Sequence, residues 1–337
     1  MKNKAYFSLL GLLLIAASGG GSVGKPSTDT VPAQYSFATG LDQAASLSPT
    51  NGEMAMSSSA GGFAQCGPFD PPESVEAPSE LRAMIQASST PAYRPAHADA
   101  RDLPGIVKLE PETDVGDDEV VTGHCSATRI ADNWFVTAAH CISEGYDRIV
   151  LKVGSEQLSS QKTQRVEADF AVCHARFKGE RNDYSHDLAL IHVDATEMNK
   201  LAEVPVVAWG QTHKQFSQQA FASARVGGWG LIEYGGDLAD YLQKEELDVR
   251  EIRDDTIRLA SRAGRGPCIG DSGGPLMVDD DGNPVMMGVL STLGANREGR
   301  ICAGEYLASY INLATHREWM LSTMAACDIN SALCRRT

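Results

Sequence analysis

The chain reads Gly270-Asp271-Ser272-Gly273-Gly274-Pro275 in its last third, a glycine-rich stretch around a single serine. Glycine adopts positive φ angles without steric cost, so the backbone can turn sharply here and expose the serine hydroxyl. The N–H groups of Gly270 and Ser272 can then point at one spot and form an oxyanion hole beside that hydroxyl. A serine alone is a weak nucleophile, so this stretch predicts a partner base elsewhere in the chain.

Two earlier segments supply a candidate base and a candidate carboxylate. His140 follows the apolar run 134–136, and Asp187 opens the apolar run 188–190. A histidine that takes a proton from serine needs a carboxylate to fix its tautomer and to stabilise it once charged. We therefore interpret His140, Asp187 and Ser272 as a candidate catalytic triad.

The same serine stretch also fits the G-x-S-x-G pattern of α/β-hydrolases, in which the acid and the histidine follow the serine. After Ser272 the one histidine is His316, which falls inside a predicted helix. The chain also lacks the alternation of strand and helix patterns that a parallel sheet needs. The sequence therefore disfavours a lipase or an esterase.

The rest of the pattern indicates an all-β fold. From about residue 92, short apolar runs such as 106–109 and 149–151 are separated by Gly, Asp, Asn and Ser, which is typical of strands joined by turns. The acidic run 279–281 before Gly282 lacks the ligand series of a calcium loop, so we expect a hairpin turn there. Apolar positions at helical spacing predict one helix over residues 311–325.

The N-terminal sequence predicts export. Lys2 and Lys4 precede 13 apolar residues at 5–17 and then small residues, as in a secretory signal peptide. Thirteen residues are fewer than the roughly 20 that span a bilayer as a helix, and a retained membrane anchor is the alternative. We expect a signal peptide at 1–18, no membrane span after its removal, and a secreted or periplasmic protein. Residues 19–91 are rich in Ser, Gly, Ala and Pro and mostly acidic, which predicts a low-complexity pro-segment or linker.

Charge and cysteine content narrow the class of protein further. The 337 residues carry a formal net charge of -15, with 29 Lys and Arg against 44 Asp and Glu, which argues against nucleic acid as a partner. Eight cysteines in an exported chain favour disulfides. No cysteine and histidine quartet has zinc-like spacing, so we expect neither a metal nor another cofactor.

Taken in order, His140, Asp187 and Ser272 resemble the triad of the chymotrypsin-like (trypsin-fold) serine peptidases. The resemblance covers about residues 104–325 and includes Gly228-Trp229-Gly230 and Gly288-Val289-Leu290-Ser291. It implies an exported, bacterial-type serine endopeptidase, a zymogen that hydrolyses protein or peptide substrates. The alternative is a catalytically silent homologue that acts as a binding module.

The resemblance also implies the architecture: two antiparallel six-stranded β-barrels with a C-terminal α-helix. The expected boundaries are a peptidase domain at 92–326, with barrel 1 at about 104–205, barrel 2 at about 206–310 and the helix at 311–325, and then a tail at 327–337.

Further roles follow from the family. His140 would act as base and then acid, Asp187 would orient it, and Gly270 and Ser272 would bind the oxyanion. The expected substrate-binding residues are Gly266, Ser291, Leu293 and Gly304, with Ser291 also supporting the aspartate. Gly266 stands where trypsin-like members carry an acid, which disfavours cleavage after Lys or Arg and favours a small to medium apolar P1 residue.

The resemblance pairs Cys125 with Cys141 and Cys268 with Cys302. Cys327 and Cys334 can close a small loop in the C-terminal tail, and we pair them by elimination. That leaves Cys66 with Cys173, a bond that would tether the pro-segment to barrel 1; the alternative is two unpaired thiols.

Asp271 is the structural residue of the site that lacks an assigned partner. Family members free an Ile-Val-Gly-Gly amino terminus whose ammonium pairs with this aspartate, and no such sequence occurs here. Arg82 and Arg101 are the candidate cleavage sites. A buried unpaired carboxylate costs several kcal/mol, so we predict that either a new amino terminus or an internal basic group pairs with Asp271.

Overall fold

The computed structural model describes residues 64–65, 96–99, 101–116, 119–143, 146–211, 222–261 and 265–335. The chain divides into compact units at 1–56 and 57–337, and every described residue belongs to the second. The predicted signal peptide and nearly all of the predicted pro-segment lie outside these residues. Within them, no helix has both the length and the apolar character that a membrane crossing requires.

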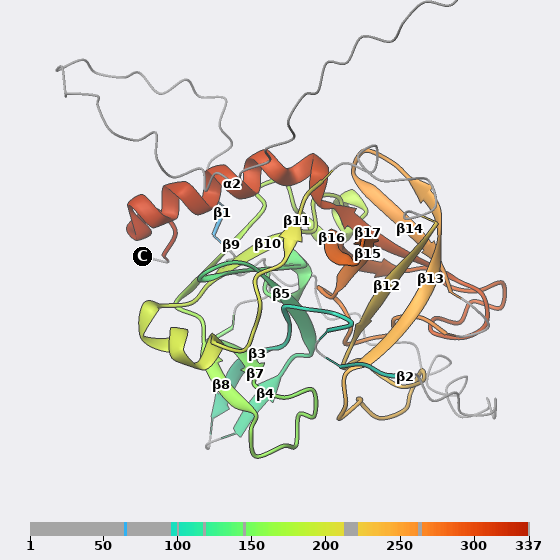
Figure 1. Cartoon of the computed structure of the whole chain (residues 1–337), viewed down its shortest axis with the longest axis horizontal. Helices are drawn as coiled ribbons and strands as arrows, with labels where there is room; N and C mark the ends of the chain where they lie inside the picture. Colours follow the sequence, from blue (N-terminus) through green and yellow to red (C-terminus); the bar gives the residue numbers. More distant parts are fainter. Residues whose placement is uncertain are drawn as a thin grey trace, which may run out of the picture. The chain divides into compact units, whose positions relative to one another are not determined.

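All but one of the described strands up to residue 192 form a nine-stranded antiparallel sheet (Figure 1). Its strands run in the order β1-β9-β10-β6-β5-β3-β7-β8, and β4 pairs with β3. Their bounds are β1 Ala64–Gln65, β3 Ile106–Gly116, β4 Glu119–Thr122, β5 Cys125–Ala131, β6 Trp134–Thr137, β7 Arg148–Val153, β8 Gln164–Glu167, β9 Phe170–Cys173 and β10 Ala189–His192.

The second half forms an eight-stranded sheet in the order β11-β16-β15-β12-β13-β14-β17, with β2 on β13. Because β16 also pairs with β17, strands β12 to β17 close on themselves as a six-stranded barrel. The bounds are β2 Ala96–His97, β11 Ala208–Trp209, β12 Ser223–Gly228, β13 Gln243–Ile252, β14 Thr256–Ala260, β15 Pro275–Asp280, β16 Asn283–Leu293 and β17 Leu307–Asn312.

The prediction of two barrel-like sheets and a C-terminal helix is confirmed, while the number of strands differs. Four of the extra strands are short: β1, β2 and β11 have two residues each and β4 has four. Two to four residues are too few to show the alternating pattern that predicts a strand. The hairpin expected at 279–282 is present, and the turn residues Asp281 and Gly282 take positive φ angles of 50° and 86°.

One apolar core joins the two barrels. It is centred on large side chains of barrel 1 such as Trp134 and Phe135, which are almost fully buried. The same cluster continues into the second sheet at Met277 and Met286 and into the C-terminal helix at Met320. A second, smaller cluster fills the interior of barrel 2. Residues at the junction of the barrels therefore lie on a rigid, packed support.

The C-terminal helix α2 spans Leu313–Ile329, so it starts two residues later and ends four residues later than predicted. The start is set by Asn312, whose side chain accepts a hydrogen bond from the Ala314 N–H as an N-cap. Asn312 is still part of β17, so strand and helix follow without a loop. Beyond the helix, the chain turns through a 3-10 segment at Ser331–Leu333.

Candidate active site

His140 and Asp187 meet because their strands are neighbours. His140 lies in a 3-10 turn at Ala139–Cys141, directly after β6, and Asp187 lies just before β10. Strands β6 and β10 are antiparallel, with Ala189 opposite Thr137, so the end of one lies beside the start of the other. The His140 Nδ1 atom is 2.7 Å from Asp187 Oδ2, and the His140 backbone N–H donates to Asp187 Oδ1 at 2.8 Å.

A third donor fixes the Asp187 carboxylate from barrel 2. The Ser291 hydroxyl, in β16, donates a hydrogen bond of 2.6 Å to Asp187 Oδ2. Asp187 has no exposed surface, whereas the His140 side chain is 26% exposed. The carboxylate thus holds the imidazole from the interior while the ring stays open to a substrate, the arrangement that a histidine base requires.

The turn that carries Ser272 packs against the strand end that leads into His140. The Ser126 N–H donates to the Ser272 carbonyl at 2.7 Å. Gly273 has a φ of +78°, and a Cβ atom there would lie only 2.2 Å from Thr137 Oγ1 and 2.2 Å from the Ser126 carbonyl oxygen. Only glycine allows this approach, so the Gly273 backbone seats the serine turn beside the histidine loop.

The backbone of the turn leaves two N–H donors unused. Asp271, Gly273 and Gly274 each donate to a backbone carbonyl of the turn or of β16. Across the part of the chain that the structure describes, the N–H groups of Gly270 and Ser272 donate to no protein acceptor. Gly270 has a φ of +94°, which few residues other than glycine adopt. These two donors are the ones that the sequence predicts for an oxyanion hole.

Asp271 points into the protein rather than toward the triad. It is 7% exposed, and its two carboxylate oxygens accept hydrogen bonds from the Gly230 N–H at 2.7 Å and the Cys268 N–H at 2.8 Å. Burial raises the pKa of Asp271, while these two N–H groups and the positive charge of Lys108 act in the opposite direction. The carboxylate therefore links the serine turn to the segment that follows β12.

Tyr306 is a residue of the expected substrate pocket that sequence reasoning missed. A Cβ atom at Gly266 would lie 2.7 Å from the Tyr306 hydroxyl, which itself donates to the Pro267 carbonyl at 2.7 Å. Ser261 accepts from the Tyr306 N–H and donates to the Gly304 carbonyl. An aromatic residue two positions after Gly304 was the available signal. The atoms nearest to a Cβ at Gly266 thus belong to two uncharged side chains, those of Tyr306 and Ser261.

The remaining expected pocket residue, Leu293, packs partly onto the core of barrel 2. It stands at the end of β16, after the register shift between Leu290 and Thr292 in the pairing with β17. Because a bulge changes which way later side chains face, sequence alignment with the family could not fix the side on which Leu293 lies.

Three of the expected disulfides form: Cys125–Cys141, Cys268–Cys302 and Cys327–Cys334. The first fastens the histidine loop to β5. The fourth pair involves Cys66, which lies outside the described residues, although Cys173 is itself disulfide-bonded. Nearby, β1 pairs with β9, with Ala64 opposite Cys173.

A metal site beside the candidate triad would need free ligand atoms. Among the described residues, Cys125, His140 and Cys141 are the one group with ligand atoms close enough to hold an ion. The two cysteines are joined to each other, so neither offers the thiolate that a metal binds.

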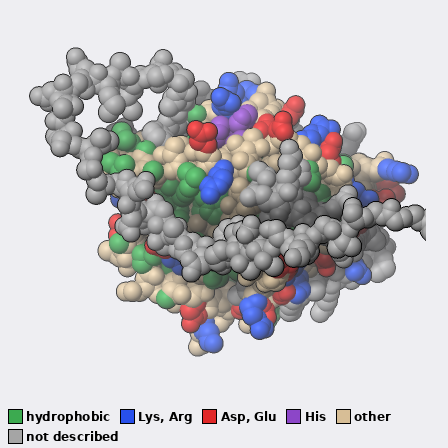
Figure 2. Space-filling view, turned by 45° about the horizontal axis from the view of Figure 1, so that its top comes forward, with side chains coloured by type: hydrophobic (Ala, Val, Ile, Leu, Met, Phe, Trp, Pro, Cys, Tyr) green, Lys and Arg blue, Asp and Glu red, His purple; other side chains and the backbone are tan. Residues whose placement is uncertain are grey.

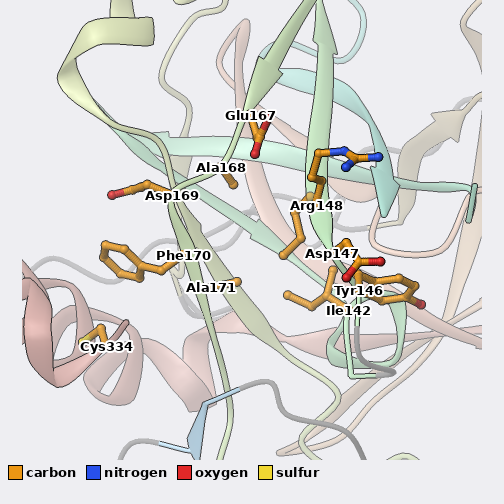
Figure 3. Close-up of a pocket in the computed structure, with 11 residues that line it drawn as sticks. Ile142, Tyr146, Asp147, Arg148, Glu167, Ala168, Asp169, Phe170, Ala171 and Cys334 are labelled. Atoms are coloured by element: carbon orange, nitrogen blue, oxygen red, sulfur yellow. The ribbon is translucent and has the colours of Figure 1, made fainter. Parts of the chain in front are cut away.

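A cavity elsewhere is lined by residues of β7 and β9 and by Cys334 (Figure 3). Two of its charged residues are paired with neighbours: Asp169 with Arg335 and His192, and Arg148 with Glu112 and Asp114. No triad residue lines it, so it is not the candidate active site. The molecular face in Figure 2 carries acidic and basic side chains side by side, with histidine at the surface.

A cluster of three histidines lies behind Asp187. The rings of His174, His186 and His316 have centroids 4.8, 5.2 and 5.3 Å apart, and Trp319 packs on His174. Burial, reinforced by the neighbouring imidazoles, lowers the pKa of His174 to about 3 and that of His316 to about 4. Burial lowers the pKa of the half-buried His186 as well, so the three histidines are neutral near pH 7, which avoids positive charges in contact.

Comparison with known proteins agrees with this geometry. Residues 100–320 match the family described as Trypsin. Among curated proteins, the chain is 28% identical over 218 residues to Trypsin of Phaedon cochleariae, covering 58% of this chain and 77% of that one. It is 26% identical over 216 residues to Trypsin-1 of Astacus astacus (58% and 86%) and 25% identical over 211 residues to Coagulation factor IX of Cavia porcellus (58% and 71%). The match covers more than half of the chain, which therefore belongs to the trypsin family of chymotrypsin-like serine peptidases.

Proposed function

We propose that this protein is a serine endopeptidase that hydrolyses peptide bonds with His140, Asp187 and Ser272. The observation that carries the proposal is the buried Asp187 carboxylate, which holds His140 at 2.7 Å while the unused Gly270 and Ser272 N–H groups flank the serine. Relatives named as trypsins support the same activity.

In the proposed reaction, the Ser272 hydroxyl oxygen attacks the scissile carbonyl as His140 Nε2 takes its proton. The negative charge on the carbonyl oxygen is stabilised by the Gly270 and Ser272 N–H groups. His140 then gives the proton to the leaving amine, and the acyl-enzyme remains. Water, deprotonated by the same imidazole, releases the acid product and restores the serine. Asp187 stays ionised throughout and stabilises the imidazolium.

The preferred substrate carries a small to medium apolar P1 residue. Two features support this proposal: Gly266 supplies no negative charge at the base of the pocket, and Tyr306 limits the depth there. A peptide library cleaved by the mature protein tests it directly, and dominant cleavage after Lys or Arg would contradict it.

The proposed setting is outside the cytoplasm, as an exported protein of bacterial type that carries a pro-segment. The signal-like N-terminus and the disulfides support export. We also propose that Cys66 bonds to Cys173 and keeps the pro-segment attached. The pairing of Ala64 with Cys173 in neighbouring strands supports this bond. Non-reducing peptide mapping tests it, and a free Cys66 thiol would contradict it.

A fluorophosphonate probe, which labels activated serines covalently, tests the activity. We expect the secreted protein to be labelled, Ser272→Ala to lose all labelling, and Ser322→Ala, on the exposed face of α2, to keep it. Folding of each variant is checked by thermal unfolding. If the folded wild type is not labelled under any activating condition, the protein is instead a catalytically silent homologue that serves as a binding module.

A further inference from the structure

Lys108 is a lysine in the interior of the protein. It belongs to β3, is 1% exposed, and its Nζ atom has no hydrogen-bond partner in the described part of the chain. A buried ammonium costs several kcal/mol unless a negative charge lies near it. The charged groups around Lys108 therefore indicate which carboxylate its ammonium balances.

The nearest carboxylate on its own strand is already paired. Glu110 lies two residues further along β3 and thus on the same face, and Lys152 Nζ donates to Glu110 at 2.8 Å. Lys152 is opposite Lys108 in the pairing of β3 with β7. Glu110 and Lys152 balance each other, so the charge of Lys108 needs a different partner.

The position of Asp271 makes its carboxylate the partner for the Lys108 charge. Ser126 is opposite Lys108 in the pairing of β3 with β5, so both side chains leave the sheet on one face. A Cβ atom at Gly228 would lie 2.8 Å from Ser126 Oγ and 2.5 Å from Asp271 Oδ1, which means that hydroxyl and carboxylate flank the same glycine. The Ser126 hydroxyl, like Lys108 Nζ, is buried without a protein partner among the described residues.

We propose that Lys108 is a positioning residue, an internal ammonium that balances the Asp271 carboxylate and so orders the oxyanion turn without a new amino terminus. This inference rests on the proposed peptidase activity. Ser126 lies beside both charges, since it is opposite Lys108 in the sheet and flanks Gly228 together with Asp271. The Ser126 N–H also donates to the Ser272 carbonyl. Lys108 acts on catalysis through Asp271 and does not touch the substrate.

The electrostatics of the site support this assignment. Burial lowers the pKa of Lys108 to about 8, while the charges of Asp271 and Glu110 raise it and that of Lys152 lowers it. Burial and the nearby charge of Lys108 also lower the pKa of His124. Below about pH 8 the ammonium is protonated and balances Asp271. As pH rises through this value the proton leaves, and Asp271 loses its counter-charge.

The rival is an amino terminus released by cleavage. A cavity beside Asp271, lined by residues that include Gly230, Ile232 and Pro267, has a volume of about 20 Å³. That is room for about one water molecule. A new terminus would have to enlarge this space, whereas Lys108 is in place in the uncleaved chain.

Labelling of Ser272 by a fluorophosphonate, together with kcat/KM on a peptide ester between pH 6 and 10, tests the proposal in the full chain with its pro-segment intact. We expect the uncleaved wild type to react, with a rate that falls above about pH 8. Lys108→Met should react about 100-fold more slowly, mainly through kcat, as when an oxyanion donor is lost. Lys108→Arg, which stays charged, should react and lose the decline above pH 8. Lys200→Met, which removes a partly exposed lysine that pairs with Glu197 away from the site, is the control and should behave as wild type.

A double-mutant cycle identifies the partner. In an Asp271→Asn background, adding Lys108→Met should change the labelling rate by less than about twofold, because the charge that Lys108 serves is gone. The proposal is overturned if Lys108→Met reacts as fast as wild type, if Lys108→Arg keeps the alkaline decline, or if the wild type reacts only after cleavage. If Lys108→Met does not fold, the pH profiles of the wild type and of Lys108→Arg still decide whether the Lys108 ammonium balances Asp271. A wild type that cleavage also fails to activate would instead contradict the proposed function.

Discussion

The Ser291 hydroxyl donates a 2.6 Å hydrogen bond to Asp187 although the two residues are 104 positions apart and come from different sheets. The proposed triad is therefore held from both barrels: His140 and Asp187 by barrel 1, and Ser272 and Ser291 by barrel 2. Any shift between the barrels would change the geometry of the site.

Removing this hydrogen bond should weaken catalysis without abolishing it. A hydrogen bond to a charged group contributes about 1.5–3 kcal/mol, and a tenfold rate change corresponds to about 1.4 kcal/mol. We expect Ser291→Ala to lower kcat about 10-fold while leaving labelling at Ser272 detectable. Steady-state kinetics on a peptide ester measure this, with Ser322→Ala as control. An unchanged kcat would mean that His140 alone orients Asp187.

Gly273 should not tolerate a side chain. A Cβ atom would clash with Thr137 and Ser126, so Gly273→Ala should cost about 3 kcal/mol or more and abolish labelling of Ser272. Gly299 offers a matched control, because it has the same φ of +78° but nothing within 4 Å of the added Cβ atom. Gly299→Ala should cost only about 1 kcal/mol. Urea unfolding measures both, and equal losses would show that φ alone matters.

The histidine cluster should limit stability in acid. The pKa of His316 is about 4 in the folded protein and near 6.5 when unfolded, so the unfolded state binds more protons between these values. Stability is therefore lost as pH falls below about 6.5, by about 2 kcal/mol at pH 4.5 from His316 alone.

The control for this loss is a variant that cannot be protonated at the same place. We expect His316→Phe to lose less stability than wild type between pH 7.5 and 4.5, measured by urea unfolding. His174, His186 and Asp255 face the same site and still contribute. A loss equal to that of the wild type would assign the acid sensitivity elsewhere.

The C-terminal disulfide should stabilise the fold and leave the chemistry alone. It closes a loop with a sequence separation of 7 residues, for which chain entropy accounts for about 2 kcal/mol. Replacing Cys327 and Cys334 together by serine should lower Tm by about 4–8 °C. Calorimetry measures the shift, and kcat serves as the readout that should stay constant. A lower kcat would show that the tail supports the triad.

The sequence predicted the contact between His140 and Asp187 better than it predicted the pairing of the strands. That contact could be predicted because a histidine base needs a carboxylate partner. The strands around Trp134 could be predicted because short apolar runs indicate buried strands. The β1 and β2 pairings could not, since two residues carry no periodic signal.

Lys108 shows a different reason for a missed residue. In the run Ile106-Val107-Lys108-Leu109-Glu110, the polar positions alternate with apolar ones, a pattern that normally gives a strand with one face in water. Here that face lies against residues of the serine turn, so the polar side chains are buried. A strand pattern shows which side chains share a face, but not what covers it.

The apolar core that runs from Trp134 through Met277 to Met320 has a consequence for unfolding. Unfolding of either barrel would expose apolar side chains of the other, because they share this core. Detachment of α2 would expose the same core to water. We expect the protein to denature in one cooperative transition, so that the candidate active site and the C-terminal helix are lost at the same temperature.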